Sequence, residues 1–445
     1  MTTGGVVRRK PAARWSNWAG NQRCAPERVV RPANELELVD AVRSAASAGL
    51  AVKAVGAGHS FTDIACTSGV QLHLDRYGQV VSVDRERQRV TVQSGIRIRA
   101  LSEELAALGL GMPNLGDVGY QSISGAVSTG THGTGARLRG LAHQVVGLEL
   151  VTGDGSVVSC SDAEEPELWS AARIGLGALG LLSTVTLQCV PAFNLRAVEK
   201  PMRVDDVLSS LDELVDGNDH FEFYWVPHTG WALTKANNRT DEPVGGRGRL
   251  REFYEQIVLE NIAFGAVCRL GRRRPQWTPR LATAVPGSGS REYVERSDRV
   301  FTTPRLVHFY EMEYSIPRAQ CANALTQLRQ MVEDSGLLIS FPVEVRFAAP
   351  DDIPLSTGFG RESCYIAVHM YQGLPYDQYF RAVEAIMAPL EGRPHWGKMH
   401  FRDASSLAPA YPRWDDFQAA RRRLDPAGRF RNAYTDRVLG PLAPA

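Results

Sequence analysis

The stretch Ala54-Val55-Gly56-Ala57-Gly58-His59-Ser60-Phe61 sets the interpretation of the whole chain. Its lead-in, residues 50–55, is short and mostly apolar, which predicts a strand that ends at the glycines. Glycines at such a point allow a positive φ and a close approach of the backbone to a ligand. By itself the stretch indicates either a loop that grips a cofactor or a tight turn with a capping histidine.

The totals describe a globular protein of two domains. The chain has 445 residues, and its 50 Lys and Arg balance 49 Asp and Glu, so no overall charge favours nucleic acid. Its seven cysteines form no CxxC pair and are odd in number, which argues against a zinc ribbon or a disulfide scaffold and favours reduced thiols. The first 20 residues contain no apolar core of a signal peptide, and no apolar run is long enough to span a membrane. We therefore expect a cytoplasmic protein.

Around the glycine loop the sequence predicts alternating helices and strands. Asn34 followed by Glu37 predicts a capped helix that reaches Gly49. Short β-branched or alternating segments at 70–74, 80–83 and 89–93 predict one small sheet, and a helix is expected over 99–108.

A second glycine-rich segment covers residues 111–135, with the sequence GMPNLGDVGYQSISGAVSTGTHGTG. Its embedded apolar residues would be costly to expose, so we expect a buried segment rather than a flexible linker. Backbone N–H groups and hydroxyls gathered in this way can form an uncharged cradle for a pyrophosphate. A packed loop without a ligand is the alternative.

A third glycine motif, GLGALG at 175–180, matches the dinucleotide-binding pattern GxGxxG. The order of elements is reversed, however, because a predicted helix precedes the glycines and an apolar strand, 181–190, follows them. The motif is therefore a poor candidate for a nicotinamide site.

From Pro191 onward, helices and strands of both types predict a second domain with a sheet covered by helices on one face. Within it, Val343-Glu344-Val345-Arg346-Phe347 alternates, so Glu344 and Arg346 share one strand face. A fixed Arg can stabilise a developing oxyanion while a neighbouring Glu positions or deprotonates a hydroxyl. A solvated sheet face is the alternative.

Two further segments concentrate reactive or charged side chains. The run 395–400, HWGKMH, holds two histidines and a lysine, but no carboxylate or thiol stands nearby at ligand spacing, so we predict no metal. The apolar run 257–268 leads into the basic run 269–280, which is compatible either with a core helix that has a solvated basic end or with peripheral contact to an anionic membrane through 257–280.

Taken together, these segments resemble the vanillyl-alcohol oxidase family of flavoproteins, and within it the sugar-1,4-lactone oxidase and dehydrogenase branch. The similarity covers nearly the whole chain and rests on Trp15-Ser16-Asn17-Trp18, VGAGHSF at 55–61, SGAVSTGTHGTG at 124–135, Glu344-x-Arg346 and His395-Trp396-Gly397-Lys398.

The resemblance implies an α+β, two-domain FAD-binding fold of the PCMH type: a FAD-binding domain at 1–190, an α+β substrate or cap domain at 191–394, and a C-terminal segment at 395–445 that returns to the flavin. It also implies that FAD is linked covalently through His59. The implied cofactor-binding residues are Gly56, Ala57, Gly58, His59, Ser60, Gly119, Ser122, Ser124, Gly125, Ser128, Thr129, Gly130, His132, Gly133, Gly180, Leu181, His395 and Lys398.

The activity that this implies is oxidation of an aldono-1,4-lactone, such as L-gulono-1,4-lactone, at its C2 hydroxyl, towards ascorbate-type products. Arg346, Glu344 and Lys398 are the implied catalytic residues. The implied electron acceptor is O₂ or a respiratory, cytochrome-type partner. An alditol oxidase of the same fold, a catalytically idle flavin-binding protein and a nicotinamide dehydrogenase stay as alternatives.

Overall fold

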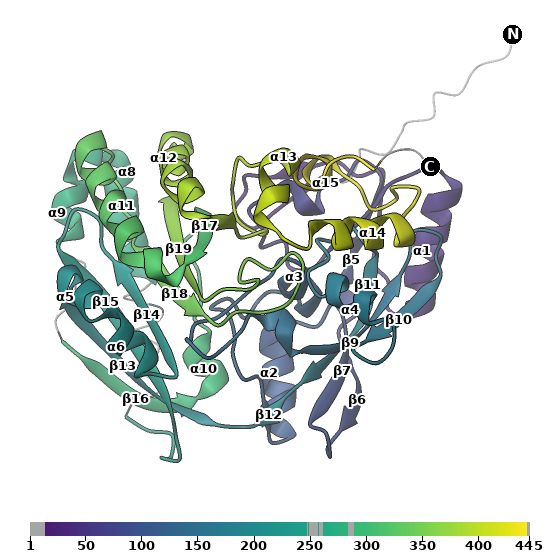
Figure 1. The fold of residues 1–445 in the computed structure, drawn as a ribbon, viewed down its shortest axis with the longest axis horizontal. Coiled ribbons are helices and arrows are strands. Elements are labelled where there is room, and N and C mark those ends of the chain that lie inside the picture. Colours follow the sequence, from purple (N-terminus) through teal and green to yellow (C-terminus); the bar gives the residue numbers. More distant parts are fainter. Residues whose placement is uncertain (1–13, 247, 249–256, 258–260, 284–288, 443–445) are drawn as a thin grey trace, which may run out of the picture.

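The computed structural model describes residues 14–246, 248, 257, 261–283 and 289–442. Figure 1 shows two bodies side by side, one built mostly from the first half of the chain and one built around a large sheet, with the C-terminal helices lying over the first body. This α+β arrangement agrees with the fold class expected from the sequence.

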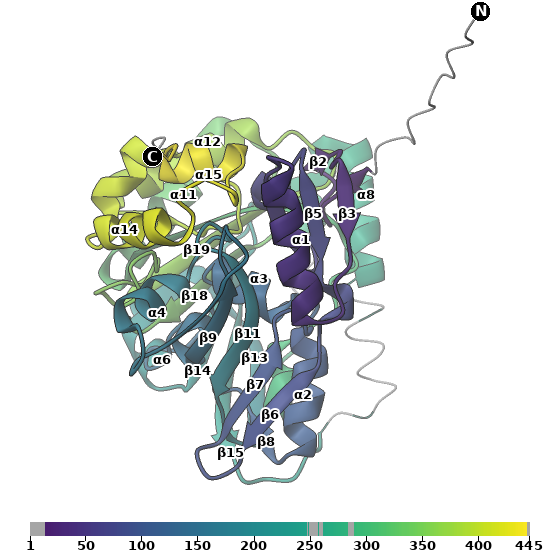
Figure 2. The ribbon, with the colours of Figure 1, turned by 90° about the vertical axis from the view of Figure 1, so that its right-hand side faces the viewer.

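The glycine loop follows a three-stranded parallel sheet, in the order β3-β5-β4. These strands are Arg28–Val30 (β3), Val52–Val55 (β4) and Val70–His73 (β5), and helix α1, Glu35–Ser47, lies between β3 and β4 in the chain and beside this sheet in Figure 2. The side chain of Asn34 accepts a hydrogen bond from the N–H of Glu37, so the predicted cap is confirmed.

The prediction that segments 70–74, 80–83 and 89–93 form one sheet is wrong. Strand β5 pairs in parallel with β3 and β4, whereas β6 (Val80–Asp84) and β7 (Arg89–Gln93) form an antiparallel hairpin in another sheet. Sequence proximity favours hairpin neighbours, but the apolar β5, buried along most of its length, fills the centre of the parallel sheet instead.

That second sheet has five strands in the order β10-β9-β11-β7-β6, and includes β9 (Val145–Val151), β10 (Val157–Ser161) and β11 (Leu181–Gln188). Helices α2 (Ile98–Ala107), α3 (Ile123–Ser128) and α4 (Pro166–Ala172) contribute buried residues to the same core. Helix α4 precedes the GLGALG segment and β11 follows it, so the predicted reversed order is confirmed.

The second body is an eight-stranded sheet in the order β16-β13-β15-β14-β18-β19-β17-β20. Its strands are β13 (Asn194–Arg203), β14 (His220–Trp225), β15 (Trp231–Thr240), β16 (Arg291–Arg296), β17 (Phe309–Pro317), β18 (Val343–Ala348), β19 (Ser363–Tyr371) and β20 (Arg393–Pro394). Helices α5 (Val204–Ser209), α6 (Leu211–Asp216), α11 (Cys321–Ser335) and α12 (Asp377–Met387) pack on one face and form an apolar core with it (Figure 1).

The C-terminal segment returns to the first body. Its helices α13 (Ala404–Leu407), α14 (Trp414–Leu424) and α15 (Ala433–Leu439) share the core of the five-stranded sheet. The N–H of Val52 donates to the carbonyl of Arg429 (2.8 Å), which satisfies one backbone donor of β4 directly before the glycine loop.

Residues 258–260 of the predicted 257–268 run lie outside the described part of the chain. Among the described residues, no helix is both long and apolar enough to cross a lipid bilayer. The shorter elements are β1 (Trp15–Ser16), β2 (Arg23–Cys24), β8 (Leu110–Gly111), β12 (Val190–Pro191), α8 (Phe264–Arg273), α9 (Thr278–Ala282) and α10 (Ser297–Phe301).

Candidate functional site

A cleft with an empty volume of about 880 Å³ opens between the glycine loop, helix α3 and the segment before β11. It brings together twelve of the predicted cofactor-binding residues. They are Gly56, Ala57, Gly58, His59, Ser60, Ser122, Ser124, Gly125, Ser128, Thr129, Gly180 and Leu181.

The two glycine-rich segments meet at one point of close contact. A Cβ placed on Gly56 would lie 1.9 Å from the Oγ of Ser122, so no larger residue fits there without a shift. Ser122 is also the N-cap of α3 and accepts a hydrogen bond from the N–H of Gly125. Backbone and hydroxyl groups thus line this side of the cleft, which fits the cradle predicted for a pyrophosphate.

The other predicted cofactor residues do not line this cleft. A Cβ on Gly119 would face Thr302, and Gly130, at φ +75°, lies against Ile174. Gly133 is packed against Asn114 and the carbonyl of Leu115. His132, His395 and Lys398 lie at the neighbouring polar face of the large sheet.

His59 is held by an aromatic stack. Its ring lies 5.4 Å from that of Trp18, which in turn stacks on His308 at 4.5 Å. Burial, with smaller contributions from the charges of Arg97 and Lys398, lowers the pKa of His59 to about 4. The imidazole is therefore neutral at physiological pH, which leaves one ring nitrogen with a nucleophilic lone pair.

The second part of the site is the face of the eight-stranded sheet opposite its helices. On β18, the apolar Val343, Val345 and Phe347 pack into the helix-covered core, whereas Glu344 and Arg346 face the other way. The predicted alternation is confirmed, but the alternative of a solvated face is wrong, since Glu344 is 7% and Arg346 8% exposed. Strands β14, β17 and β19 present Glu222, Tyr224, Glu311, Glu313 and His369 to the same face.

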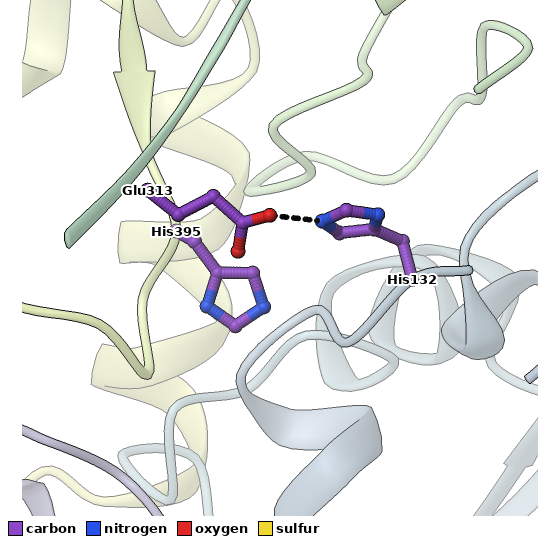
Figure 3. Close-up of side chains that lie close together, drawn as sticks. All are labelled: His132, Glu313 and His395. Atoms are coloured by element: carbon purple, nitrogen blue, oxygen red, sulfur yellow. Dashed lines mark hydrogen bonds and ion pairs between the residues drawn. The ribbon is translucent and has the colours of Figure 1, made fainter. Parts of the chain in front are cut away.

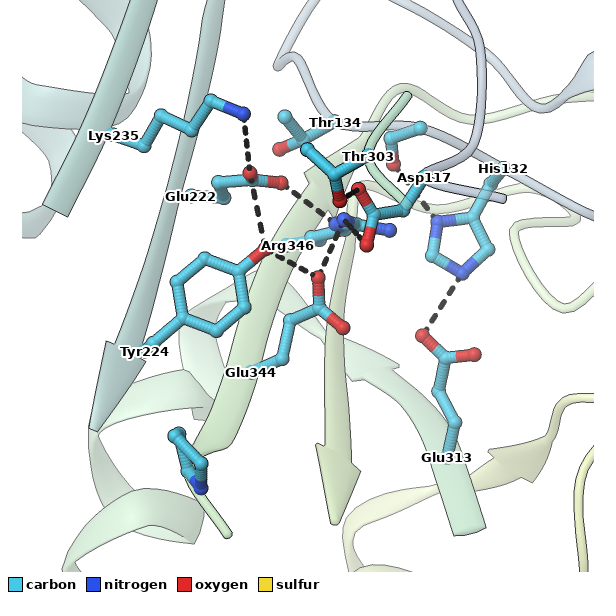
Figure 4. A network of polar contacts seen from close by, with 12 residues as sticks. Asp117, His132, Thr134, Glu222, Tyr224, Lys235, Thr303, Glu313, Glu344 and Arg346 are labelled. Atoms are coloured by element: carbon cyan, nitrogen blue, oxygen red, sulfur yellow. Dashed lines mark hydrogen bonds and ion pairs between the residues drawn. The ribbon is translucent and has the colours of Figure 1, made fainter. Parts of the chain in front are cut away.

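Arg346 is the centre of a network of buried carboxylates, as Figure 4 shows. Its Nε donates to Glu222 (2.7 Å), and its Nη2 lies 2.5 Å from Glu344 and 3.9 Å from Asp117. The hydroxyl of Tyr224 donates to Glu344 (2.9 Å). Burial disfavours the charge of Arg346, but Glu222 and Glu344 outweigh it and raise its pKa well above the usual value. The guanidinium therefore stays charged and fixes the Glu344 carboxylate.

Lys398 joins this sheet face to the glycine loop. Its ammonium is paired with Glu311 and lies 5.3 Å from the centre of the Phe61 ring, while the N–H of Phe61 donates to the carbonyl of Gly397 (2.8 Å). Burial opposes the charge of Glu311, but Lys398 outweighs it and lowers the carboxyl pKa to about 2. A fixed cation thus stands between the cleft and the carboxylates.

No carboxylate lies near His395 in the sequence, but the fold brings one beside it. Figure 3 shows Glu313, from β17, between His395 and His132. His132 Nε2 lies 3.1 Å from Glu313 and its Nδ1 2.9 Å from the carbonyl of Gly133. Both ring nitrogens of His132 thus face oxygen acceptors. Burial opposes the charge of Glu313, yet His132 outweighs it and holds the pKa of Glu313 well below its usual range, so this carboxylate stays ionised.

The hydrogen bonds of His395 disfavour a metal ion at this cluster. Its Nδ1 accepts from the N–H of Gly397 (3.0 Å), so the neutral ring carries its proton on Nε2. Burial lowers the pKa of His395 to about 4, so this neutral form dominates. A protonated Nε2 has no lone pair to offer a cation.

Besides Asp117 and the residues that β14 and β17 bring to the sheet face, Lys53 and His369 were absent from the sequence prediction. Lys53 lines the cleft, is 3% exposed, and donates to the carbonyls of Gly177 (3.0 Å) and Phe430 (3.1 Å); burial lowers its pKa to about 8. His369 lies beside Glu311 and Glu344, and its Nδ1 is 3.0 Å from the carbonyl of Pro342. Its place on β19, alternating with apolar residues, is the signal that could have identified it.

Comparison with known proteins places both parts of the site in families. Residues 26–161 match the family described as FAD binding domain, and residues 185–438 match that described as D-arabinono-1,4-lactone oxidase. Among solved structures, a solvent-stable cholesterol oxidase superposes with a TM-score of 0.80 at 19% identity, covering 97% of this chain and 98% of that one. This likeness concerns the fold alone.

Curated relatives match over nearly their full length. The chain is 48% identical over 434 residues to an L-gulono-1,4-lactone dehydrogenase of Mycobacterium tuberculosis, covering 96% of this chain and 99% of the relative. It is 35% identical to the L-gulonolactone oxidase of Bos taurus (96% and 98%) and 31% identical to an alditol oxidase of Streptomyces sp. (95% and 98%).

The fold and the cleft thus define a flavoprotein oxidoreductase with FAD as its cofactor. Within that class, the chain belongs to the D-arabinono-1,4-lactone oxidase family.

Proposed function

We propose that this protein oxidises an aldono-1,4-lactone, of which L-gulono-1,4-lactone is the first candidate, at the hydroxyl on C2. The observation that carries the proposal is the buried Glu344–Arg346 pair at the sheet face, next to the cleft that fits FAD. The names of the relatives, lactone dehydrogenase and lactone oxidases, support the same substrate class.

The residues present fit FAD, because the glycine loop and α3 offer N–H groups and hydroxyls where a Cβ on Gly56 would already clash. FAD, when bound, accepts the hydride from the oxidised carbon. The neutral His59 is the residue that would hold the flavin covalently, through the 8α-methyl group of the flavin. Trp18 keeps the His59 ring in one orientation.

The roles at the sheet face follow from the hydrogen bonds. Arg346, anchored by Glu222, supplies N–H groups that stabilise negative charge developing on the substrate oxygen. Glu344 accepts hydrogen bonds from substrate hydroxyls. The Nδ1–H of His369 donates to the carbonyl of Pro342 and its Nε2 lies 3.5 Å from Glu311, and we assign this ring as the base that takes the hydroxyl proton. Lys398 offsets negative charge on the cofactor side of the site.

The electron acceptor in this proposal is O₂ or a respiratory, cytochrome-type partner. The division at residues 190 and 394 into FAD-binding domain, cap domain and C-terminal segment is part of the same proposal. The proposal also includes a cytoplasmic location, either without membrane contact or with peripheral membrane contact through 257–280.

Exchange of Arg346 tests the proposal. We expect Arg346→Ala to lose about 10²-fold or more in turnover of L-gulono-1,4-lactone, the scale of a deleted oxyanion donor, while FAD stays bound. Turnover and flavin content are measured on the same preparation. Near-normal turnover would remove Arg346 from this role.

An alditol oxidase is the second candidate, favoured by the relative of that name. A panel of lactones and open-chain alditols separates the two candidates. A catalytically idle flavoprotein would respond to neither class.

A further inference from the structure

Cys24 and Cys66 differ from the other cysteines of the chain. All seven lie in the described residues; five are buried, and only these two are partly exposed. Their thiols interact electrostatically with each other, although 41 residues lie between them in the sequence. The amide nitrogen of Gln71 lies 3.6 Å from the Sγ of Cys24 and 3.0 Å from the carbonyl of Ala65, the residue before Cys66. Gln71 therefore bridges Cys24 to the residue before Cys66, at a place where both cysteines are partly exposed.

Each of the two cysteines is next to residues that line the cofactor cleft. Cys24, in β2, pairs directly with Trp15 of β1, and Trp15 lines the cleft. Cys66 follows Ile64 and Ala65, which line it too.

The hairpin of β1 and β2 already clamps the glycine loop through its turn. The N–H of Trp18 donates to the carbonyl of Gly58 (2.8 Å). The side chain of Asn17 donates to the carbonyl of Ser60 (3.0 Å), and that of Asn21 to the carbonyl of Phe61 (2.9 Å). A disulfide between Cys24, in this hairpin, and Cys66 would close a covalent ring that contains the whole glycine loop.

We propose that Cys24 and Cys66 form a reversible disulfide, with a small-molecule disulfide such as oxidised glutathione as the oxidant, and that this bond tightens the hairpin on the glycine loop. The Cys24 thiolate attacks one sulfur of the small disulfide, forms a mixed disulfide and releases one thiolate. Cys66 then loses its proton and attacks the Cys24 sulfur, releasing the second thiolate. One small disulfide is reduced to two thiols as two protein thiols become one disulfide.

The order of attack follows from the surroundings of Cys66. Burial, together with the neighbouring Cys24, raises the pKa of Cys66 to about 12. Cys66 therefore keeps its proton in the first step, so the first attack falls to Cys24.

The chain contains a matched control. Cys321 and Cys364 also interact electrostatically with each other, but both are 0% exposed in the core of the large sheet. A soluble disulfide cannot reach this pair in the folded protein. If a thiol pair must be both accessible and close together to be oxidised, only Cys24 and Cys66 will form a disulfide.

The full-length holoprotein is incubated with oxidised glutathione, quenched, and digested without reduction for mass spectrometry. We expect one cross-linked peptide joining Cys24 to Cys66, two hydrogens lighter than the separate peptides and released by dithiothreitol, with Cys321 and Cys364 still thiols. Cys24→Ser and Cys66→Ser should each abolish it. Stable glutathione adducts without a cross-link, no reaction, or a cross-link only between Cys321 and Cys364 would overturn the proposal.

Hydrogen exchange of the oxidised and reduced wild-type protein tests the effect on the clamp, and needs no assumption about the substrate. We expect the peptide that contains Trp18 to exchange more slowly in the oxidised form. Equal exchange rates in a protein shown to carry the cross-link would refute the tightening.

Discussion

At the scale of single residues, Gly56 tests how closely the two glycine segments must approach. Gly56→Ala places a methyl group 1.9 Å from the Ser122 Oγ, so we expect a loss of about 1–3 kcal/mol in the free energy of unfolding and a loss of bound FAD. Flavin content and denaturant unfolding measure the two effects.

Two further variants sharpen this prediction. Gly248→Ala, where nothing lies within 4 Å of the added Cβ, serves as the matched control and should change neither quantity. Gly56→Ala combined with Ser122→Gly removes the clashing side chain and should recover flavin content in part. Full flavin content in Gly56→Ala alone would contradict the account of the cleft.

Residue-scale prediction from the sequence succeeded where the pattern was local. Glu344 and Arg346 stand two positions apart on one strand, so alternation alone placed them on one face. Glu222 and Asp117 could not be found in this way, because they reach Arg346 from more than 100 residues away, through strand order that no local pattern encodes. The cysteine count indicated reduced thiols but contained no information about which thiols meet.

At the scale of elements, helix α1 depends on its cap. The Asn34 side chain accepts from the N–H of Glu37, and the Glu37 carboxylate accepts from the N–H of Ala33. We expect Asn34→Ala to reduce the free energy of unfolding by about 1 kcal/mol, measured by urea denaturation. Asn34→Asp should retain most of the stability, and an equal loss in both variants would assign the effect to something other than the cap.

Element boundaries were predictable from caps and glycines, but strand partners were not. In the five-stranded sheet, β7 pairs with β11, about 90 residues further along the chain. Strand β5 does not pair with the strand that follows it in the sequence but joins a parallel sheet. The ten-residue strands β13 and β15 went unpredicted, since β13 carries Pro201, Lys200 and Glu199 in its middle and both strands lack a clean alternation.

At the scale of the whole molecule, buried histidines predict sensitivity to acid. Burial lowers the pKa of His220 to about 4 from a usual 6.5, and its Nδ1 donates to the carbonyl of Thr134 (2.9 Å). Between these values the unfolded chain binds a proton that the folded chain does not, so stability falls as pH falls through this window.

We therefore expect His220→Asn, which keeps a donor for Thr134, to reduce the slope of unfolding free energy against pH between pH 6 and 5. The reduction should be about 1.4 kcal/mol per pH unit. Urea denaturation at several pH values measures it. An unchanged slope would show that His220 binds its proton equally in both states.

The whole molecule brings distant segments to one place. Residues from the segments 54–60, 122–129 and 177–182 line the cleft, and Lys398 and Gly397 return from the C-terminal segment to Phe61. The glycine loop that first indicated a cofactor therefore lies between the N-terminal hairpin and the sheet face that holds Glu344 and Arg346.

Anaerobic mixing of the purified protein with L-gulono-1,4-lactone tests the central claim most directly. We expect the yellow absorbance of the flavin to bleach with the lactone, and Arg346→Ala with FAD still bound to bleach at least about 10²-fold more slowly. A flavin that stays oxidised with every aldonolactone, or that bleaches only with an alditol, would contradict it.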